Sequence, residues 1–252
     1  MPAAVAWVDR RHLLQSPPGS LYSRLPEHLA VGVRGMIAEE DCVAMTRAVM
    51  DARALWTADF GGEQHSLGRA FYTHLETGRA GEYFADAEAS DGRVEAVLPG
   101  FQSGLRAELG RMLGARVVAR GGFCGPGVHV FEAGEKVARA GGVMHFDTEG
   151  LTRNQRALRA PAVTLVVMLC PAARGGGLRL WDVVYAGRPD TELDDAEIAA
   201  AARRTLRYRV GDAVLMDSYR LHQIAAFGGA GPRVSATAHA VEVSPGLWEC
   251  WF

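Results

Sequence analysis

The hydrophobic pattern divides the chain into a helical first part and a strand-rich second part. Three acids, Glu39 to Asp41, precede a run of apolar residues at helical spacing, and negative charge stabilises the first turn of a helix. Pro99-Gly100 and Gly114 are typical of helix ends. Residues 1–40 read as loop around one strand, 29–33. Helices are expected over about 38–56, 67–89 and 94–113.

From residue 116 onward, short apolar or alternating runs are separated by glycines. The segment 162–169 is a continuous apolar run of strand length, whereas 178–181 and 234–243 alternate like half-buried strands. Six to eight short strands are expected here, with a short helix over 194–203. Helices followed by strands predict an α+β chain, mainly β, in which an antiparallel sandwich or barrel packs against N-terminal helices.

Composition narrows the function classes. The chain has 252 residues, 48% hydrophobic and 22% charged, as in an ordinary globular protein. With 27 basic and 29 acidic residues, nothing favours nucleic acid or an anionic membrane as a partner. The four cysteines form no C-x-x-C pair, which argues against structural zinc and a disulfide framework. No secretory signal or membrane-length apolar run is found, so a cytoplasmic location is expected. The sequence leaves the oligomeric state undefined.

The candidate chemistry centres on His145-Phe146-Asp147. On an extended segment, residues i and i+2 point to the same side, so this imidazole and carboxylate can bind one metal ion. His74-Leu75-Glu76 has the same spacing, but in a helix these side chains diverge by about 200°. A third ligand would complete a 2-His-1-carboxylate triad, which is typical of non-haem Fe(II).

Three histidines, His129, His222 and His239, are candidates for the third ligand. His222 follows a predicted strand and precedes a glycine-rich turn at 228–232. Arg233 comes next, a residue type that forks onto carboxylates. The hydroxyl of Ser235 lies two residues on and faces the same way.

This combination of His145-x-Asp147, His222 and Arg233-x-Ser235 resembles the Fe(II)/2-oxoglutarate-dependent dioxygenase family. Segments 176–181 and 211–216 are also similar to that family, and the resemblance covers roughly residues 124–243. It implies a double-stranded β-helix core, that is, a jelly-roll or cupin-like barrel. We therefore expect one domain, 1–252, with a helical support region at 1–115 and a core at 116–252 that carries the metal site.

The resemblance implies that His145, Asp147 and His222 bind Fe(II), while Arg233 and Ser235 bind the distal carboxylate of 2-oxoglutarate. The implied reaction uses O2 to hydroxylate an unactivated C–H of a small molecule, a free amino acid or natural-product intermediate. It is coupled to decarboxylation of 2-oxoglutarate to succinate and CO2. Radical halogenases of this family lack the carboxylate ligand, so Asp147 favours oxygenation. Chain length and the tryptophan-rich tail resemble hydroxylase relatives of the small amino-acid and natural-product halogenases.

Further residues are candidates for binding 2-oxoglutarate or substrate. His129 could contact either one or be a hydrogen-bonded core histidine, and pocket lining and packing both fit His239. Surface solvation or core packing is the alternative for the others. The substrate candidates are Arg69, Tyr72, His74, Arg153, Asn154, Thr237, His239, Trp248 and Trp251.

Two other classes remain open. A prolyl-hydroxylase-like oxygenase would act on a protein or peptide with the same metal chemistry. A non-catalytic, cupin-like protein would bind metal without turnover, although the His-x-His typical of cupins is absent from the sequence.

Overall fold

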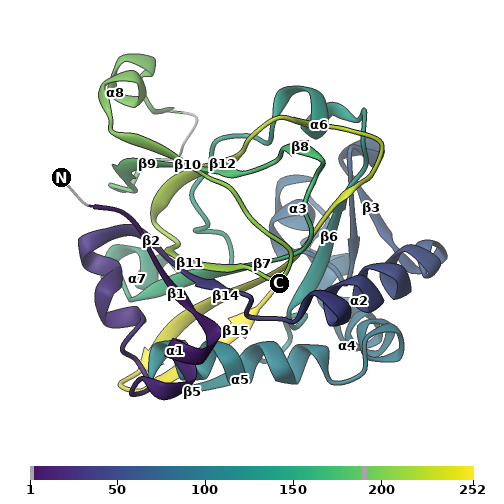
Figure 1. The fold of residues 1–252 in the computed structure, drawn as a ribbon, viewed down its shortest axis with the longest axis horizontal. Helices are drawn as coiled ribbons and strands as arrows, with labels where there is room; N and C mark the ends of the chain where they lie inside the picture. The colour runs from purple at the N-terminus through teal and green to yellow at the C-terminus, as the bar shows by residue number, and fades with distance from the viewer. Residues whose placement is uncertain (1–2, 189–191) are drawn as a thin grey trace.

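The computed structural model describes residues 3–188 and 192–252, which fold into a mixed helix and sheet structure around one large sheet (Figure 1). Within these ranges the sheet has ten strands: β1 (Ala3–Asp9), β2 (His28–Arg34), β3 (Thr57–Asp59), β4 (Gln64–Leu67), β5 (Arg116–Ala119), β6 (Gly127–Phe131), β7 (Ala162–Cys170), β11 (Ala213–Asp217), β14 (Arg233–Ser244) and β15 (Leu247–Trp251). Their order is β1-β2-β11-β7-β14-β6-β4-β3, with β15 beside β14 and β5 beside β15. All pairs are antiparallel except β1 with β2 and β5 with β15.

A smaller sheet covers part of one face of the large one. It consists of β9 (Leu178–Val184), β10 (Arg203–Leu206) and β12 (Arg220–Ile224), and a short pair joins β8 (Arg174–Gly175) to β13 (Phe227–Gly228). Leu178 and Leu180 of β9 pack with Val214 and Met216 of β11, so a thin apolar layer holds the two sheets together.

Helices cover the opposite face of the large sheet. Leu105 and Leu109 of α5, Val49 of α2 and Val94 of α4 join the main hydrophobic core there (Figure 1). The helices are α1 (Arg10–Gln15), α2 (Glu39–Asp51), α3 (Phe71–Glu76), α4 (Ala80–Val97), α5 (Phe101–Leu113), α6 (Lys136–Ala140), α7 (Arg153–Ala157) and α8 (Asp195–Ala200), with 3-10 turns at Tyr22–Glu27, Arg53–Leu55 and Phe60–Gly62. No helix among the described residues is both long and apolar enough to cross a membrane.

Strand β14 has two chemically different faces. Val234, Ala236, Ala238 and Ala240 point into the helix-covered core. The alternate residues, Arg233, Ser235, Thr237 and His239, are buried polar side chains on the other face. Because side chains alternate along a strand, β14 brings a row of polar groups between the two sheets.

The structure confirms the mixed helix and sheet class and changes some expected elements. Residues 1–115 contribute four strands, β1 to β4, besides their helices. Three of these were missed: β1, and the three- and four-residue strands β3 and β4, which carry polar residues; β3 pairs with β4, and β4 pairs with β6. The predicted helix end near residue 89 is wrong, since Asp91 stays helical and accepts hydrogen bonds from Gly125 and Gln102. The described strands pair into separate sheets, so their hydrogen bonds do not close one barrel.

Candidate active site

His145, Asp147 and His222 meet between the two sheets. The backbones of His145 and His222 exchange two hydrogen bonds of 3.0 Å as an isolated antiparallel bridge. His145 Nε2 lies 3.4 Å from Asp147 Oδ1, and His222 Nε2 lies 3.3 Å from Asp147 Oδ2. One ligand atom from each residue lies within 4.8 Å of the others, so the three can bind one metal ion. Pairing of distant segments therefore brings the predicted ligands together.

Backbone carbonyls orient both imidazoles. Nδ1 of His145 donates to the Val143 carbonyl at 2.9 Å, and Nδ1 of His222 donates to the Arg220 carbonyl at 2.9 Å. With Nδ1 protonated, Nε2 carries the lone pair that binds a metal. The ring orientation therefore fits a metal ligand in each case.

Asp147 is held by residues that the sequence analysis missed. Thr164 Oγ1 on β7 donates to Asp147 Oδ2 at 2.6 Å and lies 3.0 Å from Ser218 Oγ. The Asp147 N–H donates to the Ser218 carbonyl at 2.9 Å. Thr164 is the polar residue inside the apolar run of β7, and that interruption is the sequence signal that could have identified it.

The metal-free ligands attract one another electrostatically. Burial alone would raise the pKa of Asp147, but His222 and His239 outweigh it and hold that pKa well below its ordinary value. Desolvation opposes charge on His145, yet the hydrogen bond to Asp147 raises its pKa to about 9. The metal-free site therefore stabilises a carboxylate beside a protonated imidazole, and a metal ion can take the place of that proton.

Arg233 is a buried cation without a carboxylate partner. Only 1% of its surface is exposed, and no acid among the described residues forms an ion pair with it. Nε donates to the Gly176 carbonyl at 3.0 Å, and Nη1 donates to Ser235 Oγ at 2.9 Å. Burial lowers the pKa of Arg233 to about 10. An unpaired buried charge is costly, so the guanidinium is suited to an anion with carboxylate geometry.

Other residues surround this guanidinium. Its Cζ lies 5.6 Å from the Phe131 ring centre and 5.9 Å from that of Tyr208. The Tyr208 hydroxyl is buried and has no hydrogen-bond partner in the described part of the chain. Gly176 has φ +68°, and a Cβ there would lie 3.4 Å from Arg233 Cδ. No sequence pattern identifies Tyr208, because its place depends on how the β10–β11 connection folds.

His129 faces the same side of the sheet as Ser235, its partner across β6 and β14. Its Nδ1 accepts from Gln64 Nε2 at 3.3 Å, and the same amide nitrogen donates to the Tyr72 hydroxyl. Burial, with His239 and Arg233 nearby, lowers the pKa of His129 to about 3, so the ring is neutral. Its Nε2 then carries a proton that it can donate.

Several substrate candidates lie beside the triad. Tyr72, His239 and Trp251 line a cavity with Asp147, and so does Glu149, which the sequence analysis had not assigned a role. This cavity is narrow, with a volume of about 10 Å³, which is room for about one water molecule. Thr237 shares the strand face of His239. Burial and the neighbouring Asp147 raise the pKa of Glu149 to about 7.

Other candidates lie elsewhere. Trp248 packs in the main core, with its ring centre 5.6 Å from that of Tyr22. His74 is fully covered and contacts Arg69, which itself pairs with Asp86. As predicted, the histidine of the competing His-x-Glu pair is thus a packed helix residue. The exposed side chains of Arg153 and Asn154 lie on α7.

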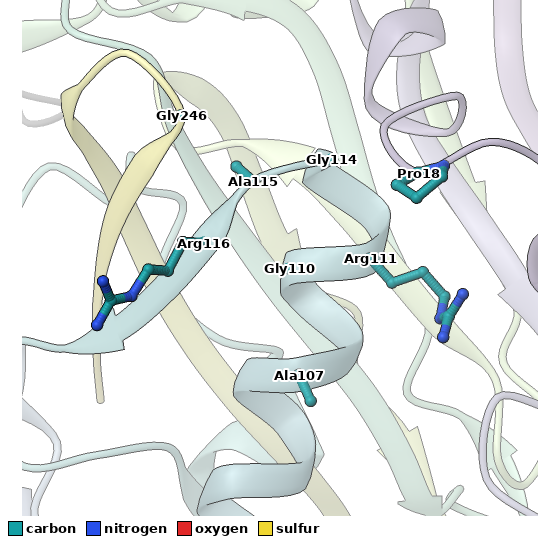
Figure 2. Close-up of a pocket in the computed structure, with 8 residues that line it drawn as sticks. All are labelled: Pro18, Ala107, Gly110, Arg111, Gly114, Ala115, Arg116 and Gly246. Atoms are coloured by element: carbon teal, nitrogen blue, oxygen red, sulfur yellow. The ribbon is translucent and has the colours of Figure 1, made fainter.

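A separate surface hollow lies near α5, β5 and the β14–β15 turn. Glycine and alanine line most of it, and the side chains of Arg111 and Arg116 point away from each other (Figure 2). It lies at the bottom of Figure 1, whereas β12, which carries His222, lies near the top. Its lining contains none of the residues of the triad or the Arg233 pocket.

The triad and the unpaired arginine together define a candidate non-haem metal site with a neighbouring carboxylate pocket. No family model and no curated protein matches the sequence. Solved structures do match, and they are consistently Fe(II)/2-oxoglutarate-dependent oxygenases. The chain therefore has the fold of that class, and the predicted resemblance is confirmed at this level.

Two particular proteins illustrate the similarity. The N-substituted L-amino acid dioxygenase from Burkholderia ambifaria AMMD, in complex with alpha-KG, gives a TM-score of 0.53 at 15% identity over 86% of this chain and 84% of that chain. A second structure of that dioxygenase gives 0.52 at 14% identity, over 84% and 91%. The non-heme alpha ketoglutarate dependent carbocyclase SnoK from nogalamycin biosynthesis gives 0.53 at 14% identity, over 89% and 92%.

Proposed function

We propose that this protein is an Fe(II)- and 2-oxoglutarate-dependent oxygenase that hydroxylates a small molecule. The observation that carries the proposal is the buried, unpaired guanidinium of Arg233, on the strand face that also reaches Asp147 through His239. A metal triad alone fits many proteins. A triad combined with a buried carboxylate pocket fits a dicarboxylate that binds metal at one end and arginine at the other.

His145, Asp147 and His222 would hold Fe(II) through two imidazole Nε2 atoms and one carboxylate. Bound there, Fe(II) and 2-oxoglutarate supply the oxygen-activating chemistry, in which 2-oxoglutarate is converted to succinate and CO2. Arg233 and Ser235 would bind the distal carboxylate, and the Tyr208 hydroxyl is placed to donate to it as well. The charge of Arg233 lowers the pKa of His129 and that of Asp147 raises it, so His129 is near both groups. Its Nε2–H is therefore suited to orient the bound co-substrate.

Thr164 and Ser218 would position the carboxylate ligand. Thr164 donates to the Asp147 carboxylate and is itself held by the Ser218 hydroxyl, so the pair would keep that carboxylate in place as a metal ligand. The aromatic side chains of Tyr72 and Trp251 would exclude water from the reacting centre. The two sheets would be the halves of a double-stranded β-helix within one domain, with residues 116–252 as its core.

A small substrate is favoured over a protein or peptide, because the cavity beside Asp147 is narrow and roofed by aromatic side chains. Hydroxylation is the outcome we propose. Ring closure is the second candidate, since the fold is shared with an enzyme described as a carbocyclase.

Succinate release in the presence of Fe(II), 2-oxoglutarate and O2 tests the proposal. Wild-type protein should form succinate, and Asp147→Ala and His222→Ala should abolish it. The substitution Glu88→Gln, on the exposed side of α4, serves as a control and should leave turnover unchanged. Succinate formation that persists in a folded Asp147→Ala protein would refute the assignment.

A further inference from the structure

The cavity beside the triad contains a carboxylate that the proposed reaction does not use. Glu149 lies two residues after Asp147, in the turn that follows the ligand segment, and both side chains line one cavity. It lines the same cavity as Asp147 and Trp251.

The basic residues around Glu149 bind its loop rather than its carboxylate. Arg120 donates to the Gly150 carbonyl, and Arg156 donates to the Leu151 carbonyl at 3.0 Å and the Thr148 carbonyl at 3.4 Å. Neither arginine forms an ion pair with Glu149 in the described structure. The loop is thus held in place while its acid faces the cavity.

Charges of both signs surround Glu149, because Arg120 and Arg156 bind the backbone of its loop while other acids lie near its carboxylate. Asp147 and Glu76 act on it as like charges, and His145 is a ligand of the candidate metal. The cavity lining, all of it within the described residues, contains no lysine or arginine. An anionic substrate group would be repelled here, whereas a cationic group would be attracted.

Aromatic rings complete the surroundings. Phe71, Tyr72 and Trp251 line the same cavity, and the faces of such rings attract ammonium groups. The guanidinium of Arg120 already covers one face of Trp251, with its Cζ 4.8 Å from the ring centre. Phe71 is fixed by Tyr83, with ring centres 5.0 Å apart. A carboxylate beside aromatic rings is a common way to bind a protonated amine.

We propose that the substrate carries a protonated amine, and that Glu149 binds it against the ring of Tyr72. This inference rests on the proposed function, because it places the amine beside the metal that would be loaded there. With cofactors bound, the charges of iron, Asp147, 2-oxoglutarate and Arg233 balance, and Glu149 leaves one net negative charge. An ammonium group would neutralise that charge.

Binding can be measured without turnover. The protein would be loaded anaerobically with Co(II) and 2-oxoglutarate, and calorimetry would follow matched probes: butylamine to hexylamine, their N-acetyl derivatives and the corresponding alcohols. The amines should bind at least about tenfold more tightly than the N-acetyl compounds, since a charge-assisted contact is lost on acetylation. Equal binding of the amines and their N-acetyl derivatives would overturn the proposal.

Substitutions then assign the effect to Glu149. Glu149→Gln should weaken amine binding by roughly 10- to 100-fold and leave alcohol binding within about twofold. Glu88→Gln removes the same charge from the surface of α4 and should change neither. Amine binding that is unaffected by Glu149→Gln would refute the assignment.

Two further measurements keep the result unambiguous. If Glu149→Gln does not fold, Glu149→Asp keeps the charge and should retain the amine preference with weaker binding; loss of the preference in that folded variant would contradict the proposal. Titration of wild-type protein with 2-oxoglutarate separates the two levels of inference. If 2-oxoglutarate binds and amines do not, amine recognition alone fails. If 2-oxoglutarate itself does not bind, the proposed function fails.

Discussion

Replacing Arg233 by methionine separates two effects of this arginine: the free-energy cost of burying its charge, and its proposed binding of 2-oxoglutarate. Methionine has a similar length and no charge, so it fills the space between Phe131 and Tyr208 without a cation. The guanidinium is 1% exposed, and its described contacts are neutral oxygens of Gly176 and Ser235. The substitution should therefore change the stability of the free protein little and weaken the complex with 2-oxoglutarate.

In the free protein two effects offset each other. Removing an unpaired buried cation relieves a desolvation penalty of several kcal/mol, on the order of 3–5 kcal/mol. Losing two hydrogen bonds from a charged donor costs about 1.5–3 kcal/mol each. The free energy of unfolding without ligand should therefore change by less than about 2–3 kcal/mol.

In the complex with 2-oxoglutarate, the substitution has only an unfavourable effect, the loss of the contact between the guanidinium and the carboxylate. Removing one partner of a buried charged pair costs about 2–5 kcal/mol, which corresponds to a rise of about 30- to 4,000-fold in the Kd for 2-oxoglutarate. Anaerobic calorimetry on Co(II)-loaded protein measures this Kd, and denaturant unfolding measures the stability. Arg204→Met, at an exposed position on β10, is the control and should change neither quantity. Wild-type 2-oxoglutarate affinity in a folded Arg233→Met protein would refute the role of this arginine.

The remaining predictions concern groups around the metal and its co-substrate. Tyr208→Phe should raise the Kd for 2-oxoglutarate by roughly 5- to 20-fold, because one hydrogen bond is lost; an unchanged Kd would show that the buried hydroxyl makes no contact with the ligand. Thr164→Val removes the 2.6 Å hydrogen bond to Asp147 and should lower Co(II) affinity by roughly 10- to 100-fold, measured by competition with a chelator. Because the pKa of His145 is raised to about 9 in the metal-free site, a metal must displace its proton below that pH. Affinity should then fall by up to about tenfold per unit as the pH drops from 9 towards 6, whereas Asp147, with its pKa held low, does not compete in this range. Calorimetry in two buffers of different ionisation heat should detect proton release, and affinity that does not depend on pH would contradict this.

Much of the site followed from local patterns in the sequence. Alternation along a strand is a local property, so it correctly placed Arg233, Ser235, Thr237 and His239 on one face of β14. The same property put His145 and Asp147 on one side of their segment. The apolar run that became β7 was identified by its length, and the helical position of His74 correctly removed it as a ligand.

Contacts between distant segments were decided by the tertiary structure. Both tail tryptophans looked alike in sequence, but Trp248 packs into the core while Trp251 reaches the cavity beside the triad. Thr164 meets Asp147 because of the register of β7 with β11 and β14. Tyr208 comes close to Arg233 through an irregular connection that has no periodicity to interpret.

The sequence by itself therefore determined which residue types lie on which face of each strand, because that information repeats every two residues. The tertiary structure decided which of those faces meet, and so whether a buried charge finds a partner. That step depends on loop paths and on the register between strands that lie far apart in the chain, which no local pattern encodes. The unpaired guanidinium of Arg233 and the position of Glu149 beside Asp147 became visible only there.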